Sequence, residues 1–256
     1  MHALTVATPG VSQTVVLRQY APHADWETIG QEAETLRSLA EAPLPVPSLL
    51  GADADGSDTD GAPSLLMTRL PGRVQLTPTD GWLRQVAAAA ARMHDLPVPD
   101  RAYVPRRPDD PLVLDSAPRP DLWRAALAAL PSEAPEEQVF LHRDLQHFNL
   151  LWRRDLLSGI TDWASVSRGP READVGHCRL NLAVLFGPDP AERLRAMYEA
   201  EIGRRLDPRW DLEALVSYED SWRDFIPHQV LGRVPVDTAG MTARVENLLA
   251  LVLERL

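Results

Sequence analysis

Short hydrophobic runs separated by turn residues open the chain and predict a small β-sheet. Residues 4–8 and 14–18 are rich in β-branched side chains, and Pro9-Gly10 separates them. Two such runs around a turn signal are typical of a β-hairpin. Two further runs, 48–50 and 64–67, flank a polar turn and predict two more short strands.

Helical spacing of apolar residues replaces these short runs in the rest of the chain. Ile29, Ala33 and Leu36 recur at the period of a helix, for which Asp25 is the expected N-cap. The same period predicts a helix-rich second half, with helices over 82–94, 121–130, 191–202, 212–226 and 238–253. The sequence therefore predicts an α+β chain with two lobes, a β-sheet lobe over residues 1–70 and a helical lobe over 71–256.

Composition and charge narrow the class of protein. The 256 residues are 45% hydrophobic and 25% charged, which is ordinary for a globular chain and excludes disordered and fibrous classes. No apolar run approaches the ~20 residues of a membrane span, and no signal-peptide pattern opens the chain, so we expect a cytoplasmic protein without a membrane partner. A formal net charge of -11 disfavours nucleic acid as a partner.

The single cysteine and the absence of lysine are two further features of the composition. Cys178 cannot form an intrachain disulfide, and the apolar residues that follow it predict a buried helix thiol rather than a nucleophile. All 26 basic residues are arginine, so a guanidinium would have to take the place of the lysine that kinase sites usually employ.

One segment carries the pattern of a catalytic loop. The buried run 139–141 leads into His142, Arg143 and Asp144, and Asn149 follows Asp144 after four residues. This is the spacing of the kinase catalytic loop. An aspartate there can orient an acceptor hydroxyl and take its proton, while an asparagine oxygen suits Mg²⁺. Asp162, expected at the end of a hairpin, would supply a second metal ligand.

A different chemistry is open to part of the same segment. His142, Asp144 and His147 could bind Zn or Fe in a metal-dependent hydrolase, because two histidines and a carboxylate are legitimate ligands. That hypothesis leaves Asn149 and Asp162 without a role, so we favour the kinase interpretation.

Over nearly its whole length the chain resembles the aminoglycoside phosphotransferase and choline kinase-like family. Residues 14–18 are similar to the third strand of the family's N-lobe, 31–39 to its helix, and 65–72 to its hinge. The resemblance implies a protein-kinase-like two-lobed fold. It also implies transfer of the γ-phosphoryl group of ATP or GTP, with Mg²⁺, to a hydroxyl of a small molecule such as an aminoglycoside, amino alcohol or sugar.

The resemblance also implies roles for single residues. Asp144 is the expected catalytic base, and Asn149 and Asp162 are the expected Mg²⁺ ligands. Arg18 is expected to contact the nucleotide phosphates and to pair with Glu32. The hinge residues expected to hold the base are Met67, Thr68, Arg69 and Leu70. Asp174 resembles a structural acid of the family.

The sequence departs from the family pattern at two points, and it offers one group of acids for an acceptor. Arg18 stands where many kinases have lysine, and its planar fork is larger and differently directed. Only three residues precede Leu4, so we expect either a misassigned start of the chain or a shortened N-lobe. A shortened lobe suggests, as the alternative function, a weak or inactive nucleotide-binding protein. Glu219, Asp220 and Asp224, beside Trp222, would suit a cationic acceptor, unless they form a solvated helix face.

Overall fold

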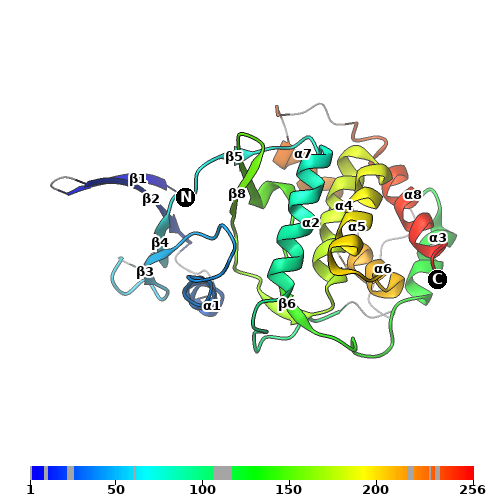
Figure 1. The fold of residues 1–256 in the computed structure, drawn as a ribbon, viewed down its shortest axis with the longest axis horizontal. Helices are drawn as coiled ribbons and strands as arrows, with labels where there is room; N and C mark the ends of the chain where they lie inside the picture. The colour runs from blue at the N-terminus through cyan, green and yellow to red at the C-terminus, as the bar shows by residue number, and fades with distance from the viewer. Residues whose placement is uncertain are drawn as a thin grey trace. The chain divides into compact units, whose positions relative to one another are not determined.

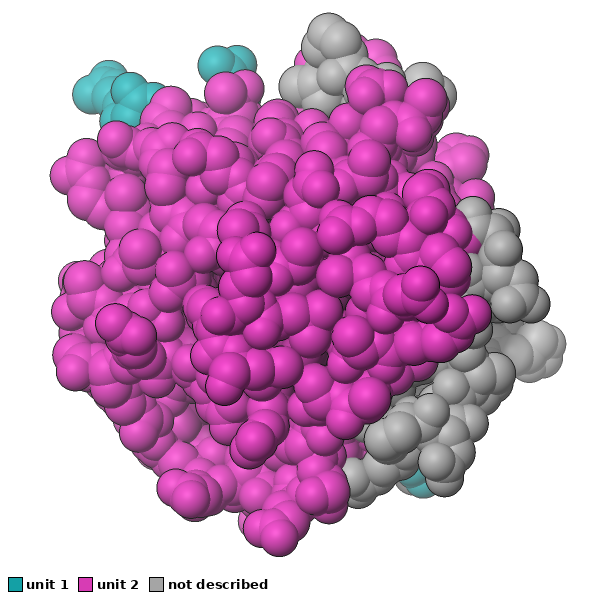
Figure 2. Space-filling view, turned by 90° about the vertical axis from the view of Figure 1, so that its right-hand side faces the viewer, with its two compact units in different colours: residues 1–74, 149–166 teal, residues 75–148, 167–256 magenta. Residues whose placement is uncertain are grey.

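The computed structural model of the chain describes residues 2–8, 11–21, 26–59, 61–105, 117–217, 222–230, 232–233 and 237–256. The chain divides into two compact units, coloured separately in Figure 2. The first consists of residues 1–74 and 149–166, and the second of residues 75–148 and 167–256. None of the described helices combines the length and the apolar character needed to cross a bilayer.

A four-stranded antiparallel sheet forms the body of the first unit (Figure 1). Its strands are β1 (His2–Thr8), β2 (Val11–Gln19), β3 (Leu49–Asp53) and β4 (Ser64–Thr68), in the order β1-β2-β4-β3. The expected hairpin is confirmed, with Thr5 opposite Thr14 in the β1–β2 register. Its predicted turn at Pro9-Gly10 lies outside the described residues.

Helix α1 (Trp26–Ser38) covers strands β3 and β4 of this sheet. Ile29, Ala33 and Leu36 are buried, as their spacing predicts, and so provide the face that packs on the strands. The expected N-cap, Asp25, lies outside the described residues.

A second small sheet in the first unit has the order β5-β7-β8, with β5 (Arg73–Val74), β7 (Leu150–Arg153) and β8 (Leu156–Ile160). The two residues between β7 and β8, Arg154 and Asp155, have φ of 51° and 62°. Positive φ at both central residues is the geometry of the tight hairpin turns that match strand twist. This hairpin delivers the segment that contains Asp162.

The second unit is helical, as expected. Its helices are α2 (Asp80–His94), α3 (Pro120–Ala128), α4 (Glu172–Phe186), α5 (Pro188–Ile202), α6 (Pro208–Val216), α7 (Trp222–Val230) and α8 (Met241–Leu253). A two-stranded sheet joins β6 (Val139–Leu141) to β9 (Ser167–Gly169). Helix α4 packs against α5, α6, α7 and α8, and α5 also packs on α2, so α4 is the central helix (Figure 1).

The position of α4 explains its composition. Nearly all of its residues are buried, including Cys178, as expected for a helix surrounded by other helices. Burial, with the charge of Asp174 as a smaller cause, raises the pKa of the Cys178 thiol to about 12, so the thiol stays protonated and inert. A Cβ at Gly176 would lie 2.5 Å from the Cβ of Ala214, so this glycine permits the close approach of α6.

The prediction of a single helix over 212–226 is wrong. Helix α6 ends at Val216, where the hydroxyl of Ser217 donates to the backbone oxygen of Glu213, and α7 begins at Trp222. Serine bonds of this kind compete with helix continuation. The apolar period continues through both helices, which is why the sequence alone suggested one.

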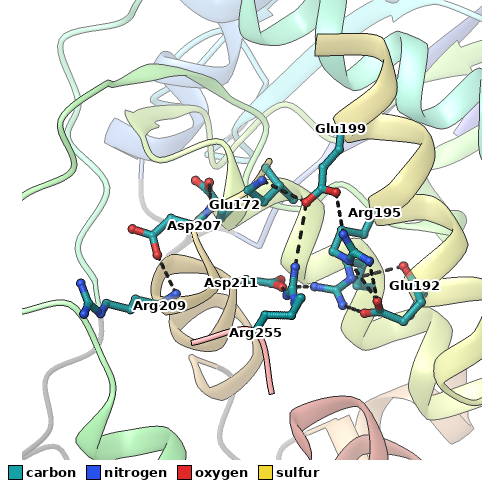
Figure 3. A network of polar contacts seen from close by, with 11 residues as sticks. Glu172, Glu192, Arg195, Glu199, Asp207, Arg209, Asp211 and Arg255 are labelled. Carbon is teal, nitrogen blue, oxygen red and sulfur yellow. Dashed lines mark hydrogen bonds and ion pairs between the residues drawn. The ribbon is translucent and has the colours of Figure 1, made fainter. Parts of the chain in front are cut away.

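A network of buried and partly buried charges ties α4, α5, α6 and the C-terminal turn together (Figure 3). The guanidinium of Arg179 on α4 is completely buried and pairs with Asp211 on α6 and Glu192 on α5. Arg255 also pairs with Asp211. Arg195 on α5 pairs with Glu199 on the same helix at 2.6 Å, which adds Glu199 to the network. Buried charges of this kind are tolerated because each has a partner of opposite sign.

Candidate active site

The catalytic-loop motif follows β6 in the second unit, and a residue of α4 holds its backbone in place. Asp174, fully buried in the first turn of α4, accepts the backbone N–H of His142 at 2.7 Å and that of Arg143 at 2.7 Å. Arg143 has φ of 71°, a left-handed conformation that costs an ordinary residue about 1 kcal/mol. Two bonds to one ionised carboxylate offset that cost, because charge-assisted bonds are among the strongest in proteins.

Asp174 is itself held by a buried chain of polar groups. His94, the last residue of α2, places Nε2 3.3 Å from the Asp174 carboxylate and Nδ1 2.5 Å from the hydroxyl of Tyr198. Arg171 lies 3.3 Å from the same hydroxyl and donates to Glu137 at 2.7 Å. Burial alone would raise the pKa of Asp174, but the hydrogen bond from His94 and the neighbouring charges and N–H groups lower it. The carboxylate therefore remains ionised and able to hold the loop.

The expected catalytic base, Asp144, is partly exposed and is engaged at one oxygen by two side chains. Nε2 of His177 lies 3.1 Å from Oδ1 of Asp144, and the amide of Gln146 donates to the same oxygen at 2.6 Å. The backbone N–H of Asp144 donates to Nδ1 of His142 at 3.2 Å. His142 is fully buried.

The metal-hydrolase alternative depends on His147, which the structure places in an apolar setting. Its ring is completely buried, lies 4.2 Å from the ring of Phe148, and has no hydrogen-bond partner among the described residues. Burial, and secondarily the charge of His177, lower the pKa of His147 to about 3, so the ring is neutral. Within the described ranges no three His, Cys, Asp or Glu side chains are grouped closely enough to share a metal ion. The hydrolase alternative therefore lacks a ligand cluster.

In the first unit, Arg18 on β2 joins two carboxylates that are distant in the sequence. Its Nη1 lies 2.9 Å from Oε1 of Glu32 on α1 and 2.9 Å from Oδ1 of Asp162. Tyr20 donates to Glu32 at 2.6 Å. Glu32 is only 2% exposed, so the pair is not the solvated surface pair that strand and helix charges usually form. The predicted contact between Arg18 and Glu32 is confirmed.

Charge explains why this cluster is stable in a partly buried setting. Burial alone would lower the pKa of Arg18, but the charges of Glu32 and Asp162 outweigh it, so the pKa is raised and the guanidinium stays charged. Burial and the hydrogen bond to Glu32 raise the pKa of Tyr20, so its hydroxyl remains a donor.

The two expected metal ligands lie on neighbouring pieces of backbone in the first unit. Asn149 ends the short helix η1 (His147–Asn149), and its backbone oxygen accepts the N–H of Thr161 at 2.9 Å. Asp162 follows with φ of 68°, and its side chain is 39% exposed. On its other side, the buried indole of Trp163 donates to the backbone oxygen of Ile160 at 2.9 Å. The segment is thus fixed at both ends around Asp162.

This donor set fits a magnesium ion. A carboxylate and an amide oxygen are hard ligands of the kind that Mg²⁺ prefers, and the exposure of Asp162 leaves room for water and phosphate. The contact with Arg18 also places a guanidinium beside the same carboxylate.

The expected hinge lies at the end of β4. Met67 and Thr68 are the last residues of the strand, while Arg69, which is exposed, and Leu70 follow it. The N–H of Thr68 already donates to the backbone oxygen of Ser48 at 2.9 Å. Backbone donors to a base would therefore have to come from the residues that follow the strand.

Of the three acids suggested for a cationic acceptor, the structure describes only Asp224. Glu219 and Asp220 lie outside the described residues, and Asp224 is exposed on α7. Trp222 is fully buried, with the guanidinium of Arg223 5.4 Å from its ring centre. The ring of Trp222 therefore packs into the core.

Sequence reasoning missed the side chains that support the loop, namely His94, Gln146, His177 and Tyr198. A signal for one of them was present. Asp174 and His177 are three residues apart on a helix, so a loop that touches one must pass close to the other. His94 and Tyr198 come from different helices, and no sequence period connects them.

A mixed fold with a small antiparallel sheet, a helical body and this catalytic loop defines a kinase-like phosphotransferase. The family model described as "Phosphotransferase enzyme family" matches residues 4–212. The chain belongs to that family. A comparison with curated protein sequences found no match.

Solved structures of the same fold are similar to this chain. Aminoglycoside phosphotransferase APH(4)-Ia matches with a TM-score of 0.64 and 16% identity, over 98% of this chain and 89% of the other. A thermostable mutant of that enzyme, solved with AMP-PNP and hygromycin B, matches at 0.63 with 14% identity, over 98% and 93%. Macrolide 2'-phosphotransferase MphH from Brachybacterium faecium matches at 0.58 with 16% identity, over 92% and 85%. At these identities the likeness establishes the fold alone.

Proposed function

We propose that this protein transfers the γ-phosphoryl group of ATP or GTP to a hydroxyl of a small molecule, with Asp144 as the general base. The observation that carries the proposal is the contact of Arg18 with both Glu32 and Asp162. In kinases, the phosphate-binding cation pairs with a helix glutamate, and a nearby aspartate holds the metal. Arg18, Glu32 and Asp162 reproduce that arrangement, with a guanidinium in place of the usual ammonium.

Each residue then has a defined task. The acceptor hydroxyl gives its proton to Asp144 as its oxygen bonds to the γ-phosphorus, and the bond from that phosphorus to the bridging oxygen breaks to release the diphosphate. Arg18 binds phosphate oxygens and Glu32 holds its guanidinium in place. Asn149 and Asp162 would hold Mg²⁺, which when bound neutralises charge on the phosphates. Backbone groups of the hinge, residues 67–70, would bind the base, with the N–H donors supplied by Arg69 and Leu70.

The acceptor belongs to the same chemical range as those of the structural neighbours. An aminoglycoside and a macrolide enzyme share this fold, and one neighbour was solved with hygromycin B. We therefore propose a polyhydroxylated or amino-bearing small molecule, such as an aminoglycoside-like compound, an amino alcohol or a sugar, as the acceptor.

An acceptor screen tests the proposal. Purified protein is incubated with γ-labelled ATP or GTP and a panel of aminoglycosides, macrolides, amino alcohols and sugars, with and without Mg²⁺. We expect Mg²⁺-dependent transfer of label to one class of acceptor. Stabilisation of the protein by Mg–nucleotide without transfer to any acceptor would instead support the alternative, an inactive nucleotide-binding protein.

A further inference from the structure

His177 and Gln146 meet at a single oxygen of Asp144. Nε2 of His177 lies 3.1 Å from Oδ1, and the amide nitrogen of Gln146 lies 2.6 Å from the same atom. The two side chains approach from different elements, since His177 is on α4 and Gln146 is in the loop itself. One carboxylate oxygen thus lies within hydrogen-bond distance of two side chains of the second unit.

Helix α4 gives this contact a rigid foundation. His177 is 1% exposed and stands three residues after Asp174, which holds the backbone of the same loop. One turn further on, Asn181 donates its amide to the backbone oxygen of His177 at 3.0 Å. A single helix therefore controls both the main chain of the loop and the side chain of Asp144.

The chemistry of a general base explains why such control matters. The torsion that turns an aspartate carboxylate is broad, so an unsupported carboxylate samples many directions. Two donors on one oxygen restrict that torsion and fix the direction of the whole group. A base acts only within hydrogen-bond reach of the proton it takes, so an error of direction lowers the rate of the chemical step.

We propose that His177 is a positioning residue for Asp144, and that it donates Nε2–H to Oδ1 together with Gln146. This inference rests on the proposed function, because it gives His177 its purpose through the base. The ring must therefore carry its proton on Nε2, and that tautomer can be observed without any turnover.

The first test is spectroscopic. Long-range ¹H–¹⁵N correlation spectra of protein with labelled histidine report the tautomer of each of the seven rings, and His177→Gln identifies the signal by its loss. We expect an Nε2–H signal from His177 that shifts in Asp144→Asn, whereas the exposed His2 keeps its signal. An Nδ1–H tautomer at His177, or a signal unchanged by Asp144→Asn, would overturn the inference.

The second test is kinetic and uses a matched pair of variants. His177→Leu keeps the volume but removes the donor, and His177→Gln keeps a donor at the equivalent position. We expect kcat to fall about 10-fold to 100-fold in His177→Leu and to recover to within about 3-fold of wild type in His177→Gln, with the KM for nucleotide unchanged in both. His2→Gln is the control and should match wild type.

The outcomes separate this inference from the proposed function. Full activity in His177→Leu, or an equal loss in both His177 variants, would overturn the positioning role while transfer by the wild type remained. A wild type that transfers phosphate to no acceptor would overturn the proposed function and the positioning role with it. Should His177→Leu fail to fold, Gln146→Leu tests the same oxygen, and we expect a loss of kcat there as well.

Discussion

The guanidinium of Arg18 lies 2.9 Å from the carboxylate of Asp162, a residue 144 positions further along the chain. This contact closes the first unit, because Arg18 belongs to its first hairpin and Asp162 to the returning segment 149–166. The same nitrogen of Arg18 also contacts Glu32 at 2.9 Å. One cation therefore depends on two carboxylates, and changes at any of the three have distinct expected effects.

Removal of the Arg18 guanidinium should lower the catalytic efficiency for the nucleotide. We expect Arg18→Ala to lower kcat/KM for Mg–nucleotide by about 100-fold, the usual loss when one electrostatic contact to a reacting group is removed. Steady-state kinetics at varied nucleotide measure this. Arg73, an exposed residue of β5, provides the matched control as Arg73→Ala. Equal kinetics of Arg18→Ala and the control would contradict the role given to Arg18.

Loss of the acid beneath the loop should affect both stability and catalysis. In Asp174→Asn the NH₂ of the amide faces the N–H group of His142 or of Arg143, so one of these buried donors loses its acceptor. We therefore expect the free energy of unfolding to fall by about 3 kcal/mol. Denaturant titration measures this change. Asp189→Asn, on the exposed face of α5, should be nearly neutral. A fall in Asp174→Asn no greater than in the control would show that Asp174 does not hold the loop.

A buried carboxyl should make stability depend on pH. Burial is the main cause that raises the pKa of Glu172, to about 7. A raised carboxyl pKa favours the folded state at low pH. The contribution of Glu172 to the free energy of unfolding is therefore fully present below about pH 4.5 and is lost as the pH rises to 7. The loss should total about 3 kcal/mol, because each pKa unit is worth ~1.4 kcal/mol.

The variant Glu172→Gln isolates this effect. Glutamine keeps an acceptor for the N–H of Asp207, which lies 2.9 Å from Glu172 (Figure 3). We expect Glu172→Gln to flatten the dependence of unfolding free energy on pH between 5 and 8, as measured by thermal or denaturant unfolding. The exposed Glu133→Gln should leave the dependence as in wild type. Identical pH profiles for Glu172→Gln and wild type would refute the assignment.

The buried ion network of the second unit should respond strongly to the loss of one member. Asp211 accepts from both Arg179 and Arg255, and Arg179 is completely buried. Asp211→Asn leaves these cations undercompensated, so we expect a destabilisation of about 3 kcal/mol. Calorimetric melting measures it. A change below about 1 kcal/mol, the usual range of exposed pairs, would show that the network is not structural.

Much of the fold could be predicted because local pattern and tertiary structure agree. The first hairpin, helix α1 and the loop 142–149 each carry a local signal: β-branched runs, a period of 3.6, and a fixed motif. The predicted contact between Arg18 and Glu32 was confirmed, and it followed from the family resemblance rather than from a local period. Neither the central position of α4 nor the break after Val216 could be read from the sequence, since a helix buried all round has no amphipathic face.

The support of the site was less predictable than its motif. His94, Tyr198 and Arg171 form one buried chain, but they come from elements whose neighbourhood only packing determines. The aromatic ring of Trp222, which the sequence places beside three acids, is part of the core, and composition cannot distinguish a buried indole from an exposed one. The roles proposed for the loop residues could be inferred from the motif, whereas the contacts that support the loop depend on how the helices pack.

The rate of phosphoryl transfer by Asp144→Asn, measured beside its affinity for Mg–nucleotide, tests the central claim most directly. If Asp144 is the general base, the variant binds Mg–nucleotide as the wild type does but transfers phosphate to the acceptor about 10²-fold to 10⁴-fold more slowly. Transfer at the wild-type rate by a folded Asp144→Asn protein would contradict the account.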